Sequence, residues 1–74
     1  GPVEAGNRVV IVEDVTTTGG SSLLAIDRAV EFGLHVERVI TVIDRLAGAT
    51  EAFAARGIPL ESLVTIRDLG IEPE

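Results

Sequence analysis

The sequence contains no cysteine and a single histidine, His35, among its 74 residues. Disulfide frameworks and thiolate metal sites are therefore excluded, and so is a site built from several histidines. Nucleophilic chemistry by a cysteine or by a serine–histidine pair is disfavoured for the same reason. We expect no resident metal site in this chain. We place His35 in a solvated loop after Gly33 and Leu34 and assign it no role.

Lysine is absent as well, because all six basic residues are arginines, against twelve acidic residues and a net charge of −6. A surface of that sign repels polyanions at long range, so nucleic acid is not an expected partner. Positive charge for phosphate chemistry must come from arginine, backbone N–H groups or a metal ion. No apolar run approaches the roughly 18 residues of a membrane span and no leader precedes the first one. We expect a cytoplasmic protein with no membrane partner.

The length of 74 residues leaves room for one small domain. A chain this short buries only about 60% of its unfolded surface, so its stability should be marginal. Residues 1–7 are small or polar and lack periodicity, and Gly1-Pro2 looks like the remnant of a cleaved purification tag. We therefore divide the chain into a tag remnant and linker at 1–7, a domain at 8–70 and a tail at 71–74.

Three runs rich in valine and isoleucine alternate with two helical patterns. The apolar runs predict strands at 8–13, 39–43 and 62–66, each bounded by glycine, proline or polar residues. Apolar residues at helical spacing predict a helix at 21–32 that Gly33 ends in the left-handed conformation, and a shorter helix follows at 49–56. The apolar face of the first helix comprises Leu23, Ile26, Ala29 and Val30. The alternative, a helical hairpin with apolar linkers, fits these runs less well.

The order β-α-β-α-β predicts an α/β fold with a three-stranded parallel sheet and right-handed connections. Parallel sheets need cover on both faces, and two helices lie on one face if the strands are added in one direction. One face of the first strand is then bare. We expect half of a doubly wound, Rossmann-like domain. We also expect a homo-oligomer that covers the bare face, formed for example by exchange of the third strand or a helix.

The segment after the first strand, EDVTTTGGSS at 13–22, predicts an anion cradle. Glycines at 19 and 20 allow positive φ angles and a close approach of the backbone to a ligand. The helix that follows offers free N–H groups and the positive end of its dipole. Five hydroxyl groups join them, from Thr16, Thr17, Thr18, Ser21 and Ser22. A plain turn with a helix cap is the alternative, but it needs only two or three such residues.

Glu13 and Asp14 come immediately before this cradle. Carboxylates repel phosphate, so they must address a different part of the ligand. An ionised carboxylate accepts hydrogen bonds only, and vicinal hydroxyl groups are a natural target for such a pair. The spacing suits a sugar phosphate lying along the loop, whereas the alternative is that both residues simply end the strand in solvent.

Residues 9–22, VVIVEDVTTTGGSS, resemble the phosphoribosyl-pyrophosphate (PRPP) motif of the type I phosphoribosyltransferases. That motif is a hydrophobic strand, two acidic residues, an aliphatic residue and a threonine- and glycine-rich phosphate loop. Residues 42–69 resemble the C-terminal end of the orotate-specific members, the orotate phosphoribosyltransferases. The likeness covers about sixty of the 74 residues.

The resemblance implies a set of roles for individual residues. Glu13 and Asp14 would hold the ribose hydroxyls and stabilise the oxocarbenium character of the sugar, and Thr17 and Arg45 would contact orotate. Mg²⁺ would arrive with PRPP. Alternatively, Arg45 is a surface residue bonded to Asp44 or to a helix end. The residues implied to surround PRPP and its 5′-phosphate are Glu13, Asp14, Val15, Thr16, Thr17, Thr18, Gly19, Gly20 and Ser21.

Two departures from the family pattern stand out. Thr16 occupies a position that is usually aliphatic, which is acceptable if its hydroxyl finds a backbone partner. The family's pyrophosphate loop and mobile catalytic lysine have no counterpart here. We therefore expect a C-terminal portion that binds PRPP, ribose 5-phosphate, orotate, phosphate or sulfate but is inactive alone.

Two other functions stay open at this point. One is a transferase for adenine, uracil or hypoxanthine, or an amidophosphoribosyl-type protein. Arg45 disfavours these ligands because a neutral base has no carboxylate to pair with it. The other is a non-catalytic PRPP- or phosphate-binding fragment made for folding study.

Overall fold

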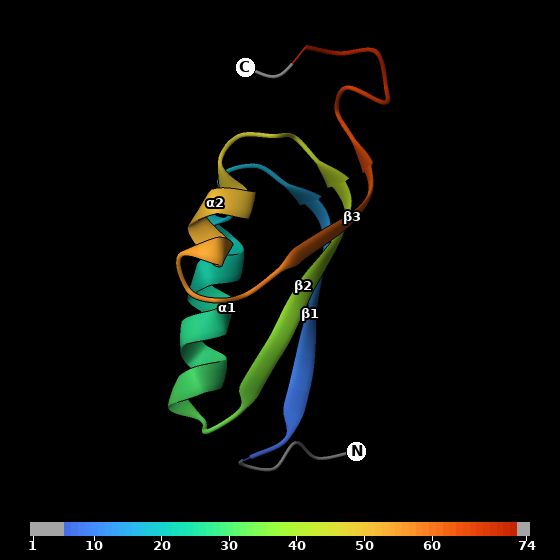
Figure 1. Ribbon diagram of the computed structural model, residues 1–74. Helices are drawn as coiled ribbons and strands as arrows, with labels where there is room; N and C mark the ends of the chain where they lie inside the picture. Colours follow the sequence, from blue (N-terminus) through green and yellow to red (C-terminus); the bar gives the residue numbers. More distant parts are fainter. Residues whose placement is uncertain (1–5, 73–74) are drawn as a thin grey trace.

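The structure is a computed structural model that describes residues 6–72. Its elements follow the predicted β-α-β-α-β order (Figure 1). Most of the expected tag remnant, residues 1–5, and the last two residues of the expected tail lie outside the described range. The elements are β1 (Arg8–Thr16), α1 (Gly20–Glu31), β2 (His35–Asp44), α2 (Ala49–Ala54) and β3 (Leu60–Thr65).

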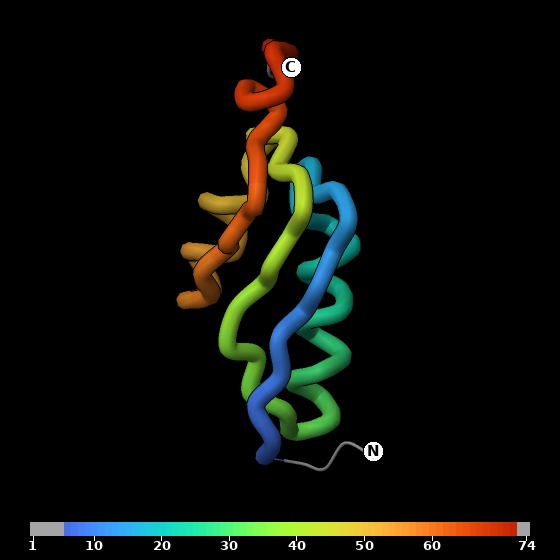
Figure 2. The backbone as a smooth tube through the Cα atoms, turned by 90° about the vertical axis from the view of Figure 1, so that its right-hand side faces the viewer, coloured from blue at the N-terminus to red at the C-terminus, as the bar shows by residue number. Residues whose placement is uncertain are grey.

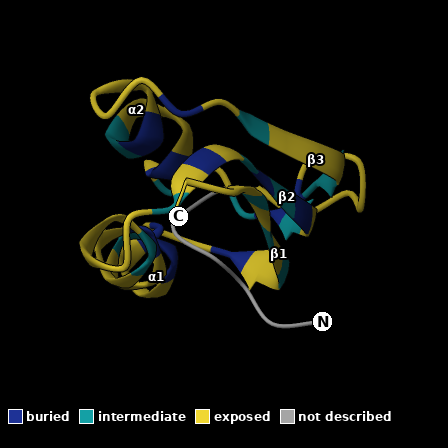
Figure 3. Cartoon of the chain, turned by 90° about the horizontal axis from the view of Figure 1, so that it is seen from below, coloured by how far each residue is buried: buried dark blue, intermediate teal, exposed yellow. Residues whose placement is uncertain are grey.

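The three strands form one parallel sheet in the order β1-β2-β3. Because the chain adds each strand on the same side of the last, both right-handed crossovers bring their helices to the same face. Figure 3 shows α1 and α2 together on one side of the sheet. The predicted parallel α/β architecture is confirmed.

The core lies between this face and the two helices. Ile26 of α1, Val39 of β2 and Phe53 of α2 are completely buried there. Val36, Ala49 and Ile58 complete the cluster of buried side chains. Val30 was predicted to face the core, but it is 54% exposed. It lies in the last turn of α1, and α2 covers only the opposite end of the molecule (Figure 1), so no second helix packs beside it.

The strands are longer than their apolar runs. The first strand was predicted to end at Glu13, but β1 continues through Thr16, so Asp14 also belongs to the strand rather than to the turn. β2 begins at His35, whose N–H donates to the carbonyl of Asn7. The prediction of a loop at His35 is therefore wrong, although the residue is exposed. Pairing with a neighbouring strand extends an element through polar residues that lack the apolar pattern.

The opposite face of the sheet carries no helix within residues 6–72. Figure 2 looks onto this face, with the three strands in front of the helices. Val12 and Leu63 project from it and are 71% and 73% exposed, and Val10 and Val42 are also exposed. We call these four side chains the open face. In the same described range, no helix has the length and apolar character needed to cross a membrane.

Candidate phosphate and sugar site

The carboxyl ends of all three strands meet at one edge of the sheet, as parallel pairing requires. The loops after β1 and β2 and the first turns of both helices lie at this edge, at the top of Figure 1. The N–H of Arg45 donates to the carbonyl of Thr16 at 2.9 Å, and the N–H of Ile66 donates to the carbonyl of Asp44 at 2.8 Å. These bonds hold the three loops together. Ligands of open α/β sheets bind at such an edge.

The loop between β1 and α1 is shaped by one glycine. Gly19 is the residue preceding α1, has φ 87°, and no side chain caps the helix. The N–H groups of its first turn therefore have no side-chain acceptor and remain able to bind an anion. Gly20 is not among the glycines with positive φ, because it is already the first residue of α1. The prediction that both glycines need this freedom is wrong for Gly20.

The five predicted hydroxyls do not form one set. Thr17, Thr18 and Ser21 are exposed at the loop and the start of α1. Thr16 is 3% exposed, and its Oγ1 has no hydrogen-bond partner among the described residues. The expected backbone partner of Thr16 is thus missing. Ser22 is buried and its Oγ donates to Oε1 of Glu13 at 2.9 Å, so it faces β1 rather than the loop.

The acidic pair is divided between the two faces of the sheet. Successive side chains of a strand point to opposite faces. Glu13 is half-buried on the helix-covered face, where it contacts Ser22, while Asp14 is exposed. The structure therefore does not bring the two carboxylates together on one face. A single sugar can touch both only by lying across the end of β1.

The loop after β2 is organised by a buried carboxylate. Asp44 is 4% exposed; its Oδ1 accepts the N–H of Leu46 at 2.9 Å, and its Oδ2 accepts the Thr50 hydroxyl at 3.5 Å. Leu46 takes a positive φ of 57° within this turn. Arg45 is half-buried between them, at the same edge as the threonine loop. The sequence signal for this role is an aspartate that ends an apolar run just before a turn. From the sequence, Asp44 was considered only as an alternative partner of Arg45, so the part that Asp44 plays in the loop was missed.

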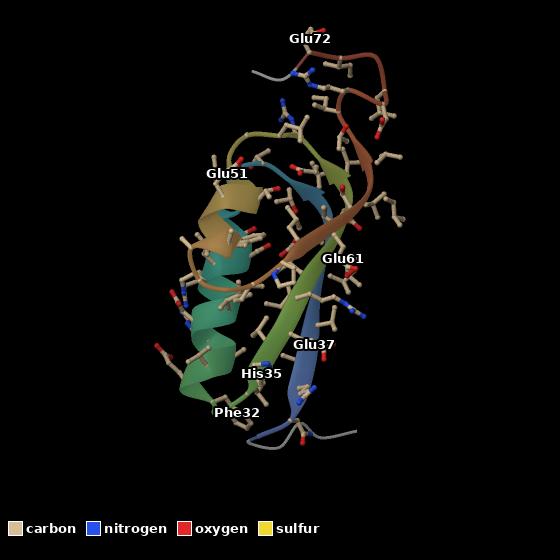
Figure 4. All side chains as sticks on the ribbon, in the orientation of Figure 1. Phe32, His35, Glu37, Glu51, Glu61 and Glu72 are labelled. Atoms are coloured by element: carbon tan, nitrogen blue, oxygen red, sulfur yellow. The ribbon has the colours of Figure 1, made fainter. Side chains whose placement is uncertain are left out.

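Side chains at the other end of the molecule take no part in this edge. Figure 4 shows Phe32 and His35 at the end opposite the three loops, whereas Glu51 lies beside them in the first turn of α2. Within residues 6–72, no three aspartate, glutamate or histidine side chains gather in a way that could hold a metal ion. The edge thus offers backbone N–H groups, hydroxyls, separate carboxylates and the guanidinium group of Arg45.

Comparison with known proteins identifies the family. A protein of Rhodopirellula baltica named orotate phosphoribosyltransferase is 58% identical over 73 residues, which are 99% of this chain and 38% of that protein. The chain therefore belongs to the orotate phosphoribosyltransferase family. It spans about 38% of the length of this curated relative. No family model matches the chain.

Solved orotate phosphoribosyltransferases have the same fold over the matched part. The Mycobacterium tuberculosis enzyme in complex with inorganic phosphate is similar with a TM-score of 0.88 and 42% identity, over 96% of this chain and 42% of the enzyme. The same enzyme in complex with PRPP gives a TM-score of 0.82 and 44% identity, over 86% and 40% of the two chains. The predicted resemblance and the α/β fold are confirmed. The roles of individual site residues remain predictions.

Proposed function

We propose that this chain is the part of an orotate phosphoribosyltransferase that binds PRPP and ribose 5-phosphate. The parent reaction joins orotate to the ribose of PRPP and releases pyrophosphate, giving orotidine 5′-phosphate. The observation that carries the proposal is the uncapped first turn of α1 behind Gly19, with Thr17, Thr18 and Ser21 exposed around it. Phosphate and PRPP complexes of the similar M. tuberculosis enzyme support it.

The 5′-phosphate would lie in the loop of residues 16–21. Backbone N–H groups and the positive end of the α1 dipole attract it, and threonine and serine hydroxyls complete its hydrogen bonds. No lysine is present to add charge, and the net charge is −6. We therefore expect affinity only in the mM range, or about −4 kcal/mol.

Glu13 and Asp14 would act on the sugar. Positive charge develops on the ribose C1 as pyrophosphate departs, and carboxylates at the end of β1 stabilise such charge. Oxygen ligands and substrate phosphates are what Mg²⁺ prefers. Since the described residues form no metal cluster of their own, we propose that Mg²⁺ arrives bound to PRPP rather than to a resident site.

Arg45 would bind the orotate carboxylate. A guanidinium group matches a planar carboxylate with two parallel hydrogen bonds. The backbone bond from Arg45 to Thr16 holds this residue next to the threonine loop. This position favours orotate over a neutral base, and Thr17 would lie near the same ring.

The chain by itself should not transfer phosphoribose, because a chain without lysine has no counterpart of the family's catalytic lysine. Purified chain mixed with orotate, PRPP and Mg²⁺ should form no orotidine 5′-phosphate above a protein-free control. An NMR titration with ribose 5-phosphate tests the binding itself. Amides of Thr17, Thr18 and Ser21 should shift, and unmoved amides at saturating ligand would refute the proposed site.

A cytoplasmic location of the protein remains a prediction.

A second copy of the chain would cover the open face. Val12 and Leu63 are more than two-thirds exposed there, and each exposed aliphatic side chain forgoes about 1.5–3 kcal/mol of burial. That is a large share of the stability of a small domain. We therefore propose a homo-oligomer in which a second copy of the chain buries these side chains.

A further inference from the structure

Ser22 is one of the five hydroxyl residues of the predicted anion cradle, but its side chain faces the sheet rather than the loop. It is 1% exposed and lies in the first turn of α1, on the side that faces the sheet. Its hydroxyl donates to Oε1 of Glu13 at 2.9 Å. A buried hydroxyl paired with a carboxylate forms one of the stronger hydrogen bonds of a protein. The first turn of α1 is thereby fixed to the acidic end of β1.

The neighbouring hydroxyl on this face is engaged elsewhere. Thr41 is paired with Glu13 in the sheet register. Its Oγ1 donates to the carbonyl of Ile43 at 3.1 Å and approaches the carbonyl of Asp14 at 3.5 Å. Among residues 6–72, Ser22 is therefore the side chain that donates a hydrogen bond to the Glu13 carboxylate and orients it. A carboxylate accepts about four hydrogen bonds, so the bond to Ser22 leaves the second oxygen able to accept a ligand hydroxyl.

The two ends of the proposed ligand site share this single helical turn. Ser21 is exposed at the loop, and Ser22, the next residue, faces β1. The N–H groups that would hold the phosphate and the hydroxyl that holds Glu13 are thus parts of one rigid unit. A fixed separation between a phosphate site and a hydroxyl acceptor is what recognition of a sugar phosphate requires.

We propose that Ser22 is a positioning residue that aims the Glu13 carboxylate at a ribose hydroxyl while its own helical turn holds the phosphate. The inference rests on the proposed function, because it needs the loop to bind the 5′-phosphate. It predicts that Ser22 contributes to the affinity for ribose 5-phosphate but not to that for inorganic phosphate. A merely structural serine would affect both ligands alike.

The test compares three ligands by NMR titration: ribose 5-phosphate, 2-deoxyribose 5-phosphate and inorganic phosphate. The variants are Ser22→Ala, Glu13→Gln and the double variant, with Ser62→Ala on β3 as a matched control for loss of a serine hydroxyl. Ser22→Ala should weaken ribose 5-phosphate binding about fivefold, the effect of one hydrogen bond. Affinity for inorganic phosphate should change by less than about twofold. The unfolding transition of each variant is recorded alongside.

Coupling between the two residues gives the second readout. If Ser22 acts through Glu13, adding Ser22→Ala to the Glu13→Gln variant should cause no further loss of affinity for ribose 5-phosphate. Its effect should also shrink for 2-deoxyribose 5-phosphate if Glu13 binds the 2-hydroxyl. Ser22→Thr, which keeps a hydroxyl, should restore the preference for ribose 5-phosphate wherever its unfolding transition matches that of the unchanged chain.

The outcomes separate the two proposals. If the unchanged chain binds ribose 5-phosphate no more tightly than inorganic phosphate, the proposed sugar contact fails and the role of Ser22 fails with it. If the unchanged chain prefers the sugar phosphate and Ser22→Ala keeps that preference, only the role of Ser22 is overturned. Equal losses for both ligands in Ser22→Ala also overturn it, because they indicate a structural effect on the loop.

Discussion

Gly19 lies directly against the ring of Phe53: a Cβ atom at Gly19 would come within 2.8 Å of Cε1 and 2.9 Å of Cζ. The phosphate loop and the centre of the core are therefore in contact. Gly19 also has a φ of 87°, a backbone angle that residues other than glycine adopt only with steric strain. Gly19 is thus restricted twice, once by its own backbone conformation and once by Phe53 of α2, the helix between β2 and β3.

Gly19→Ala should destabilise the chain by about 2–4 kcal/mol, the sum of backbone strain and overpacking. Gly48→Ala is the matched control, because Gly48 has the same role before α2 and a φ of 106°, with nothing within 4 Å of its Cβ position. Urea unfolding of both variants measures the difference. Equal losses of stability would show that the contact with Phe53 is relieved without cost.

The two phenylalanines should behave in opposite ways. Phe53 is fully buried whereas Phe32 is 58% exposed. Phe53→Ala should lower the free energy of unfolding by about 3–5 kcal/mol, which is a large part of the stability of a small domain. Phe32→Ala should change the free energy of unfolding by no more than about 0.5 kcal/mol. Thermal unfolding followed by circular dichroism provides the comparison. A folded Phe53→Ala variant with an unchanged transition would mean that the core does not centre on this ring.

Arg45→Gln should reduce orotate binding without reducing phosphate binding. A carboxylate that loses its guanidinium partner loses charge-assisted hydrogen bonds, so we expect at least a tenfold weaker interaction, or about 1.4 kcal/mol or more. Arg28→Gln, in the last turn of α1, is the control because it lies away from the loop edge. Titration with orotate in the presence of saturating ribose 5-phosphate measures the effect. Equal affinities in both variants would contradict the role of Arg45.

The open face should govern self-association. Leu63→Gln replaces a side chain that is 73% exposed on this face, and Leu24→Gln replaces one that is 55% exposed on α1. Only the first should weaken assembly, by about tenfold or more, because each buried leucine contributes about 1.5–3 kcal/mol. Sedimentation equilibrium at about 100 μM measures the mass. A mass of 7.8 kDa for the unchanged chain would show that it does not assemble.

Much of the site could be predicted because its signals are local. Glycine before a helix, consecutive hydroxyl residues and an acidic pair after an apolar run occur within ten residues of one another. The predicted anion loop accordingly coincides with the uncapped start of α1. The local pattern did not reveal which face of the sheet each acidic side chain points to. Because β1 continues to Thr16, Glu13 and Asp14 both lie within the strand, where successive side chains point to opposite faces.

The sequence by itself determined the element order, the parallel sheet, the uncovered face and the family, because apolar periodicity and a contiguous motif are properties of neighbouring residues. Only the tertiary structure decided which polar groups are already engaged. It turned Ser22 toward Glu13, left the hydroxyl of Thr16 buried without a partner, and placed Phe53 against Gly19. These contacts join residues of different elements. Their partners depend on how helices pack on a sheet, and no local pattern encodes that packing.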